Sequence, residues 1–280
     1  MSRKALVTFG TAPMSEILAV TMQSKRALAE RHGYELIVGD GSSADRPVVW
    51  GKPLLLRRLI QSYDWLLFID ADAVVLDWSE DPIDSVPASA FQALVLEGNR
   101  NPNVGVWLLR ASPETERFLD AMWSLTEFID HPWREQAAAM KLLGYRTEKP
   151  WTSESETEWT AGTHWLSEEW NSVVIIRGFV PCRIRHYAGY PNGFRLRRLR
   201  LDKASIEARH KGNGRWLRMI EYLYRRAVEG SRAVLVGYPR HLPMHPVRRT
   251  LRRADDRIRR FLYPRFPWLG SVRRAIFRDR

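Results

Sequence analysis

The stretch Trp65-Leu66-Leu67-Phe68-Ile69-Asp70-Ala71-Asp72 places five consecutive apolar residues directly before two aspartates. An uninterrupted apolar run of this length is typical of a strand that is buried on both faces, as in a parallel sheet. The aspartates mark the point where this strand leaves the core, and ligands of open α/β sheets bind at the carboxyl ends of the strands. The stretch therefore predicts an α/β fold with a ligand site beside Asp70 and Asp72.

The two aspartates indicate a metal site. In an extended segment, residues i and i+2 point to the same side, so Asp70 and Asp72 would offer two carboxylates to one ion. Hard oxygen ligands suit Mg²⁺ or Mn²⁺, which typically carries a substrate diphosphate. The alternative is a polar turn that follows a core strand and binds no ion.

The rest of the first 190 residues predicts alternating strands and helices. We expect strands over residues 5–9, 34–38, 65–72, 91–96, 103–109, 171–176 and 184–187, and helices over 15–31, 52–61, 112–128 and 133–143. Gly33 and Gly144 stop two of the helices, and Ser112 with Pro113 begins a third. The strand–helix–strand order favours a mostly parallel sheet, flanked by helices and joined by right-handed crossovers.

Length and composition divide the chain of 280 residues into one large domain, 1–200, and a basic helical region, 201–280. The single cysteine, Cys182, excludes an internal disulfide and is consistent with a reducing compartment. The N-terminus lacks the pattern of a signal peptide, and no run of about 18 apolar residues predicts a membrane span. We expect a cytoplasmic protein, which would be peripheral at the inner face of a membrane if the basic region binds there.

The charge is unevenly distributed along the chain. Residues 181–280 contain 27 Lys and Arg against 7 Asp and Glu, whereas residues 1–180 contain 17 against 25. Narrow apolar stripes among the arginines beyond residue 200 are typical of helices that lie on an anionic membrane surface. The alternatives are a charged face packed on the core and, as the least favoured reading, a nucleic-acid contact.

Residues 151–170 predict a long ordered loop, in which four tryptophans lie among Glu, Ser and Thr without periodicity. Exposed indole rings would suit the stacking of sugar rings. The alternative, to which we give equal weight, is that these rings cover the sheet, since tryptophan is usually mostly buried.

Four further features carry chemistry. The step from Asn103 to Gly105 combines an amide with a glycine that lets a ligand approach the backbone. Glu135 and Gln136 lie in the first turn of a helix, where polar groups can face a ligand. Lys52 supplies a cation, and His186 supplies an imidazole. Each residue taken singly also fits a purely structural role.

Taken together and in order, these motifs resemble a known family. The sequence is similar to the galactosyl, mannosyl and xylosyl transferases of glycosyltransferase family 34, the yeast α-galactosyltransferase and plant xyloglucan xylosyltransferase type. The resemblance spans about residues 4–190 and rests on residues 27–34, Trp50-Gly51-Lys52, 63–73, 103–106, 132–138, Trp170-Asn171 and His186-Tyr187-Ala188-Gly189.

This resemblance implies a GT-A fold and metal-dependent transfer of a hexose or pentose. The donor would be a nucleoside diphosphate sugar with UDP or GDP, the acceptor a carbohydrate or glycosylated hydroxyl, and the anomeric configuration would be retained. Asp70, Asp72 and His186 would hold Mn²⁺ or Mg²⁺. Lys52 would lie near the donor phosphates, and Asn103 and Gln136 would surround the donor sugar.

We assign further residues to the donor site: Thr8, Phe9, Gly10, Ala71, Gly105 and Gly189. Two routes to retention remain open. The acceptor attacks from the side of the leaving group, or a side chain acts as a transient nucleophile, for which Glu135 and Gln136 are the catalytic candidates.

The chain departs from the family pattern in three ways. We expect no N-terminal anchor, the asparagine usually found before one helix is replaced around Ser24-Lys25, and the region after residue 200 has no counterpart that we can name. Two other classes therefore remain as alternatives: a metal-dependent nucleotidyltransferase on a similar fold, or a protein that binds membranes or polyanions through its basic tail. The absence of a Gly-rich P-loop argues against an NTPase.

Overall fold

The computed structural model describes residues 2–12, 14–98, 101–148 and 152–208. The chain divides into two compact units, Met1–Leu199 and Arg200–Arg280. All the candidate site residues lie in the first unit. From position 209 onward, the predicted basic region lies outside the described residues.

The centre of the first unit is a six-stranded sheet with the order β2-β1-β3-β6-β5-β7. Its strands are β1 (Lys4–Phe9), β2 (Tyr34–Gly39), β3 (Trp65–Ile69), β5 (Gln92–Leu96), β6 (Pro102–Arg110) and β7 (Thr163–Leu166). Only β6 runs antiparallel to its neighbours, β3 and β5, and the other pairs are parallel. The predicted mostly parallel α/β sheet is confirmed, and the reversed strand is a feature that the sequence reading did not include.

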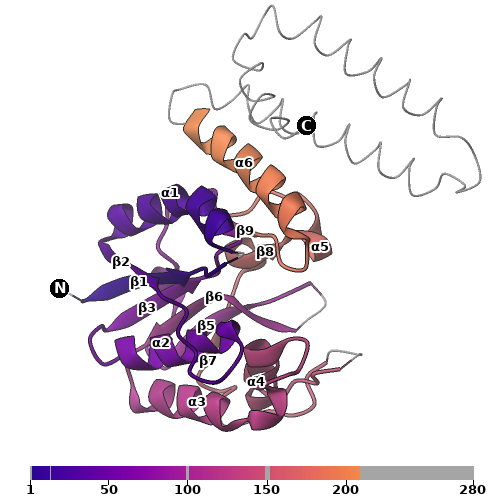
Figure 1. Ribbon diagram of the computed structural model, residues 1–280. Helices are drawn as coiled ribbons and strands as arrows, with labels where there is room; N and C mark the ends of the chain where they lie inside the picture. Colours follow the sequence, from indigo (N-terminus) through magenta and orange to yellow (C-terminus); the bar gives the residue numbers. More distant parts are fainter. Residues whose placement is uncertain (1, 13, 99–100, 149–151, 209–280) are drawn as a thin grey trace, which may run out of the picture. The chain divides into compact units, whose positions relative to one another are not determined.

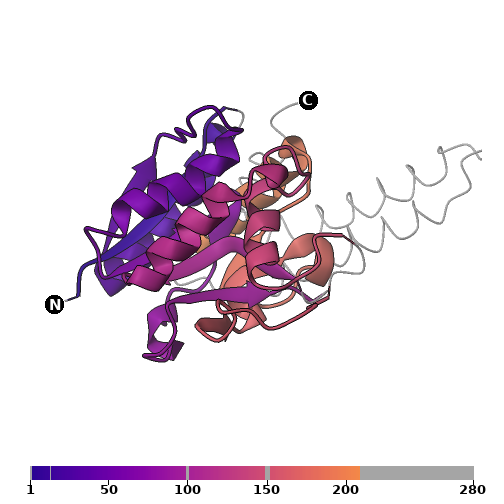
Figure 2. The ribbon, with the colours of Figure 1, turned by 90° about the horizontal axis from the view of Figure 1, so that it is seen from below.

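Helices cover both faces of this sheet (Figure 1). One face carries α1 (Ser15–His32), and the other carries α2 (Gly51–Leu59), α3 (Pro113–Ser124) and α4 (Arg134–Leu142). Figure 2 shows α2 and α3 side by side on their face of the sheet.

Burial on both faces explains the uninterrupted apolar run in β3. Leu66 and Phe68 pack toward α2 and α3, whereas Leu67 and Ile69 belong to the cluster on the α1 side. Alternate side chains of a strand point to opposite faces, so both sets must be apolar when both faces are covered.

A smaller sheet with the order β4-β9-β8 extends this core. Its strands are β4 (Ala73–Val75), β8 (Ser172–Val173) and β9 (Ile184–His186), and the short helix α5 (Val174–Arg177) follows β8. β4 pairs antiparallel with β9, and Ala73 is opposite His186. This pairing brings the end of the predicted domain beside the segment that follows β3.

Local sequence signals correctly predicted the end of α1 and the start of α3. Gly33 follows α1 with φ +70°, a left-handed conformation that glycine adopts without strain, and its N–H bonds to the Ala29 carbonyl. The Ser112 side chain accepts a hydrogen bond from the Thr115 N–H and begins α3. The predicted helix 112–128 is too long, because α3 ends at Ser124 and a separate 3-10 turn, Thr126–Phe128, follows.

The predictions for residues 151–176 are partly wrong. The expected loop contains the edge strand β7 and a 3-10 turn, Glu168–Asn171, and the expected strand 171–176 is reduced to β8 followed by α5. β7 is only four residues long, and its pairing with β5 is a tertiary contact that local sequence does not encode. Trp159 and Trp170 are buried, so the packing alternative holds for these two rings.

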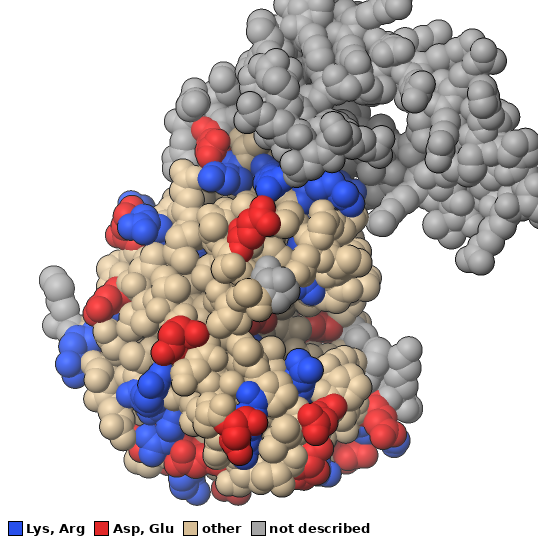
Figure 3. All heavy atoms as spheres, viewed as in Figure 1, with Lys and Arg blue, Asp and Glu red and all other residues tan. Residues whose placement is uncertain are grey.

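In the described part of the chain, no helix is both long and apolar enough to cross a membrane. The last described helix is α6 (Asn192–Ala208). Figure 3 shows Lys and Arg side chains close together over α6, whereas charges of both signs are interspersed over the lower part of this face.

Candidate metal and donor site

The two aspartates lie in a tight turn rather than in an extended strand. β3 ends at Ile69, and the Ala73 N–H donates to the Asp70 carbonyl across 3.1 Å. The expectation that the strand stays extended through Asp72 is therefore wrong. The turn nevertheless brings both carboxylates to one side, so the polar turn and the paired carboxylates are the same feature.

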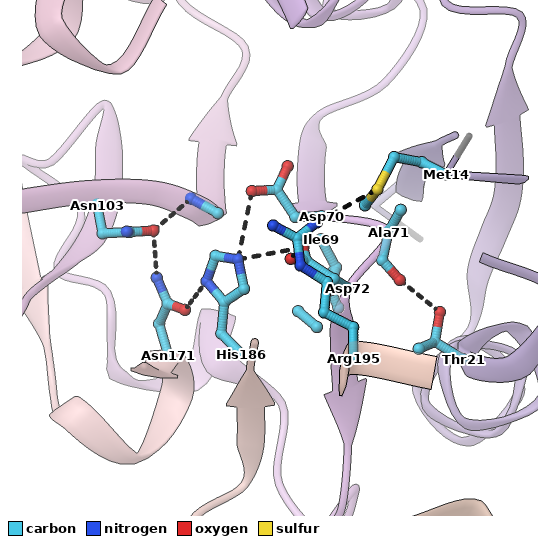
Figure 4. Close-up of polar contacts among 12 residues, drawn as sticks. Met14, Thr21, Ile69, Asp70, Ala71, Asp72, Asn103, Asn171, His186 and Arg195 are labelled. Atoms are coloured by element: carbon cyan, nitrogen blue, oxygen red, sulfur yellow. Dashed lines mark hydrogen bonds and ion pairs between the residues drawn. The ribbon is translucent and has the colours of Figure 1, made fainter. Parts of the chain in front are cut away.

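Three side chains converge at this turn. The His186 Nε2 lies 3.3 Å from Asp72 Oδ1 and 3.7 Å from Asp70 Oδ2 (Figure 4). One ligand atom from each of Asp70, Asp72 and His186 lies within 4.8 Å of the others. Asp72 and His186 are buried, whereas the Asp70 side chain is 29% exposed and gives the group access to the outside.

The two buried members of this group stabilise each other's charged forms. Burial alone would raise the pKa of Asp72, but the imidazole of His186 and the guanidinium of Arg195 lower that pKa to about 2. Burial alone would lower the pKa of His186, but the carboxylates of Asp72 and Asp70 raise it above its ordinary value. The site thus favours the carboxylate form of Asp72, which is the form that a cation requires.

Helix α1 supports the turn from behind. The Lys25 Nζ lies 2.7 Å from Thr21 Oγ1, 2.8 Å from the Ala73 carbonyl and 3.5 Å from the Ala71 carbonyl. Thr21 donates to the Ala71 carbonyl across 2.8 Å. Thr21 and Lys25 are four residues apart and so share one face of the helix, which places both of them under the turn.

Strand β6 contacts the turn from the other side. Because β6 is antiparallel to β3, its early residue Gly105 lies beside the end of β3, and the Asp70 N–H donates to the Gly105 carbonyl across 2.8 Å. A Cβ at Gly105 would lie only 2.7 Å from His186 Nδ1, so glycine is what allows this approach.

A chain of amide side chains reaches His186 from behind. The His186 Nδ1 lies 2.9 Å from Asn171 Oδ1, and Asn171 Nδ2 donates to Asn103 Oδ1 across 2.7 Å. Asn103 Oδ1 also accepts from the Gly105 N–H across 2.7 Å, and Asn103 Nδ2 donates to Glu97. Asn103 therefore reaches the imidazole only through Asn171, and both the oxygen and the nitrogen of its side-chain amide are hydrogen-bonded.

A second charged group adjoins Asp70. Lys52, in the first turn of α2, places its Nζ 3.1 Å from Asp70 Oδ1 and 3.2 Å from Glu135 Oε1. Burial lowers the pKa of Lys52, but Asp70 and Glu135 outweigh this effect and raise it, so the ammonium remains charged. Burial raises the pKa of Glu135 above its ordinary value, although the nearby Lys52 opposes that rise.

The backbone before Glu135 is strained. Arg134, the first residue of α4, has φ +42°, in the left-handed region that residues with a side chain seldom adopt. Such strain persists where the surrounding structure enforces it, which is frequent at functional sites. Here it accompanies the placement of a buried carboxylate against Lys52.

The other predicted donor-site residues fall into two groups. Thr8 and Gly10 lie beside the turn: Thr8 donates to the Ile69 carbonyl across 2.7 Å, and a Cβ on Gly10 would lie 3.3 Å from the Ala71 Cβ. The Phe9 ring packs against Phe68, with 5.9 Å between ring centroids.

The remaining two are placed less tightly. Gln136 follows Glu135 in α4 and is partly exposed. Gly189 follows β9 with φ +78°, and the nearest side chain to its added Cβ would be Ile175. The structure thus gathers Asp70, Asp72, His186, Lys52 and Glu135, whereas it shows no such convergence for Gly189.

Sequence reasoning did not assign a role to four residues of this region: Lys25, Glu97, Asn171 and Arg195. Arg195 of α6 places its NH1 3.3 Å from Asp72 Oδ2, but in the sequence it is one arginine in a basic stretch. The sequence does contain a signal for Lys25, because a charged residue there lies on the same apolar face of α1 as Leu28.

The residues present fit a divalent cation. Two carboxylates and one imidazole nitrogen suit Mn²⁺, and the carboxylates also suit Mg²⁺. The His186 Nδ1 is bonded to Asn171, so Nε2 is the nitrogen that faces the carboxylates. This arrangement of a ligand histidine held from behind by a polar side chain is usual in metal sites.

Comparison with solved structures identifies the fold. A glycosyltransferase involved in glycosylation of the major capsid of PBCV-1 matches with a TM-score of 0.50 and 13% identity, over 73% of this chain and 98% of that one. GlyE of Streptococcus pneumoniae TIGR4 follows with a TM-score of 0.47 and 13% identity, over 69% and 57% of the two chains. Mouse xyloside xylosyltransferase 1 gives 0.42 and 13%, over 68% and 99%.

The first of these matches shows the fold: the chain has the GT-A fold of glycosyltransferases. The sequence model of the galactosyl transferase GMA12/MNN10 family matches residues 6–90, which run from within β1 to beyond β4 and include both aspartates of the turn. Over these residues the chain resembles this family of transferases. A search of curated proteins gave no match.

Proposed function

We propose that the protein transfers a hexose or pentose from a nucleoside diphosphate sugar, with UDP or GDP, to a hydroxyl of a carbohydrate or glycosylated acceptor. We also propose that the reaction depends on Mn²⁺ or Mg²⁺ held by Asp70, Asp72 and His186. The observation that carries the proposal is the convergence of these three side chains at the carboxyl end of β3. That end of a strand is where α/β sheets bind ligands.

The chemistry needs charge stabilisation more than covalent work. Negative charge grows on the diphosphate as the sugar leaves, and a bound divalent ion would supply Lewis-acid stabilisation of that charge. Asp70, the exposed member of the group, would orient toward the donor, while buried Asp72 and His186 keep a fixed geometry. The ammonium of Lys52 holds Asp70 and Glu135 in place through its two ion pairs.

Retention at the anomeric carbon is part of the proposal and derives from the family resemblance. Glu135 is the candidate that the structure supports better than Gln136 for a role at the reacting carbon. Its carboxylate is buried and shares Lys52 with Asp70, which places it next to the candidate ion site. The anomeric configuration of the product, measured by proton NMR, would test retention.

Titration calorimetry of the intact protein tests the main proposal. UDP, GDP, CDP and ADP would be titrated with and without Mn²⁺, and we expect one of them to bind only when the ion is present. Asp70→Asn and Asp72→Asn should abolish this binding. A matched control is Asp120→Asn, because Asp120 is an exposed aspartate of α3 that pairs with Arg57.

The outcomes separate the alternatives. Metal-dependent binding of a nucleoside diphosphate, followed by transfer of sugar from the corresponding donor, supports the glycosyltransferase. Binding and turnover of a nucleoside triphosphate instead would favour the nucleotidyltransferase. Full binding in the Asp70→Asn/Asp72→Asn double variant would contradict the metal assignment.

A further inference from the structure

We propose that Glu97, Asn103 and Asn171 are positioning residues that fix which nitrogen of His186 carries its hydrogen. They hold the neutral ring as the Nδ1–H tautomer, so that the Nε2 lone pair faces Asp70 and Asp72. The inference rests on the proposed metal site for its purpose, but its first test requires no ion.

The direction of the hydrogen-bond chain is set by one backbone group. The Gly105 N–H can only donate, and it lies 2.7 Å from Asn103 Oδ1. That atom of Asn103 must therefore be the carbonyl oxygen. The amide nitrogen of Asn103 then points to Glu97, whose carboxylate accepts from it.

The same argument fixes the orientation of the Asn171 amide. The atom of Asn171 that faces Asn103 Oδ1 at 2.7 Å must be the amide nitrogen, because two carbonyl oxygens would repel each other. The other atom of the Asn171 amide is then its oxygen, which faces His186 Nδ1 at 2.9 Å (Figure 4). A carbonyl oxygen only accepts, so Nδ1 carries the hydrogen and Nε2 is free to act as a ligand.

Burial makes this direction costly to reverse. Asn103, Asn171 and His186 are each at most 3% exposed, so water has little access to compensate a mispaired atom. Flipping either amide would oppose two acceptors or two donors, and leaving a buried polar group unpaired destabilises the folded state. Both atoms of the Asn103 amide are hydrogen-bonded within the protein, so Asn103 acts on the site by orienting His186 through Asn171.

The sequence reading placed Asn103 around the donor sugar and quoted Asn171 without a role. In our proposal, both asparagines act on the site by orienting the imidazole of His186. Loss of either asparagine should change the orientation and tautomer of an imidazole, rather than remove a contact to the sugar.

The first test is the tautomer of His186 in the metal-free, intact protein. The histidine side chains would be labelled with ¹⁵N, and the His186 signal, one of seven, would be identified by its loss in His186→Gln. With the pH raised until the ring is neutral, we expect a protonated Nδ1 and an unprotonated Nε2. A neutral ring protonated at Nε2 would overturn the proposal.

The second test compares two buried amides. Asn171→Leu should release the tautomer preference and weaken Mn²⁺ binding by about 10- to 100-fold, the usual effect of losing such a partner. The matched control is Gln92→Leu, because Gln92 is buried and bonds to Trp107 and Thr163 away from the site. It should leave both the tautomer and the Mn²⁺ affinity unchanged.

These tests distinguish failure of the positioning role from failure of the proposed function. If Gln92→Leu weakened Mn²⁺ binding as much as Asn171→Leu did, general loss of stability would explain the effect and the positioning role would be wrong. If the wild-type protein bound no nucleotide with metal, the proposed function would fail. The tautomer measured without metal would still decide the positioning role.

Discussion

Gly105 shows how a single missing side chain shapes the site. A Cβ there would collide with the imidazole carbon Cε1 of His186 and lie 2.8 Å from Asn103 Oδ1. We expect Gly105→Ala to displace the ring and weaken Mn²⁺ binding roughly tenfold or more, as measured by calorimetry.

The matched control for Gly105→Ala is a glycine with a similar clash in the core. A Cβ at Gly162, just before β7, would lie 2.5 Å from Phe91 Cδ1, away from Asp70, Asp72 and His186. Gly162→Ala should lower the free energy of unfolding without changing Mn²⁺ affinity. Equal affinities for Gly105→Ala and the wild type would show that the ring does not need this approach.

Lys25 predicts a pH dependence of stability. Burial lowers the pKa of Lys25 to about 7, although the charges of Asp72 and Asp70 oppose the shift. Between about pH 7 and the unfolded value of 10.5, the unfolded chain holds a proton that the folded chain has lost. The Lys25 contribution to the free energy of unfolding therefore rises with pH in this window and is flat below it.

Urea unfolding of metal-free wild type and Lys25→Met at about pH 6, 8 and 10 checks this expectation. The difference between the two proteins isolates Lys25, because the other titrating groups are shared. We expect the wild type to gain stability relative to the variant as the pH rises. A difference that stays constant with pH would mean that Lys25 keeps its ordinary pKa.

Among residues, the sequence pointed to the three side chains that converge at the turn better than to the residues that contact them. Asp70 and Asp72 are marked by the strand before them, and His186 by its order in the family motifs. Asn171 bonds to Asn103, which is distant in the sequence, and Glu97 reaches Asn103 because β5 pairs with β6, so no local pattern distinguishes these two residues. The catalytic, donor-binding and metal-binding roles assigned to all of the site residues remain predictions.

At the scale of elements, Ser112 provides a simple test of a local signal. Its side chain accepts the Thr115 N–H at the start of α3. Ser112→Ala should lower the free energy of unfolding by about 1 kcal/mol, measured with urea, because one N-terminal N–H loses its partner. Nucleotide binding should not change, since α3 carries none of the site residues.

Ser124, at the other end of α3, is the control for this prediction. Its hydroxyl donates to the Asp120 carbonyl at an exposed position. Ser124→Ala should change stability by no more than about 0.5 kcal/mol. A loss as large as that of Ser112→Ala would mean that the cap contributes nothing specific.

Elements with strong local patterns were predicted, and those defined by pairing were not. The apolar runs of β1 and β3 and the amphipathic α1 follow from burial and periodicity. The antiparallel direction of β6 and the edge strand β7 depend on partners elsewhere in the chain. The direction of β6 matters for the site, because it brings Gly105 to the end of β3.

At the scale of the whole molecule, the excess of positive charge lies in the C-terminal part of the sequence. Residues 181–280 carry 27 of the 44 Lys and Arg. We predict that the full-length protein binds vesicles containing anionic phosphatidylserine more strongly than neutral ones, with an affinity that falls as salt rises. Cosedimentation would measure this binding.

Changing Arg248 and Arg249 to Glu should reduce vesicle binding and leave nucleotide binding intact. The control changes Arg57 and Arg58 of α2 to Glu, which alters the charge elsewhere on the molecule. If the two variants lost vesicle binding equally, net charge alone would explain the effect. Stronger binding to RNA than to vesicles would favour the polyanion alternative.

The pairing of Ala73 with His186 closes a loop of more than 100 residues. An ion held by Asp72 and His186 would join the two ends of that loop as a reversible cross-link. A ligand that binds only the folded chain stabilises the folded state by mass action, and this ion would bind only after the long loop has closed. Chelation should therefore expose the protein to proteolysis, and a chain still too short to include His186 could not yet form this cross-link.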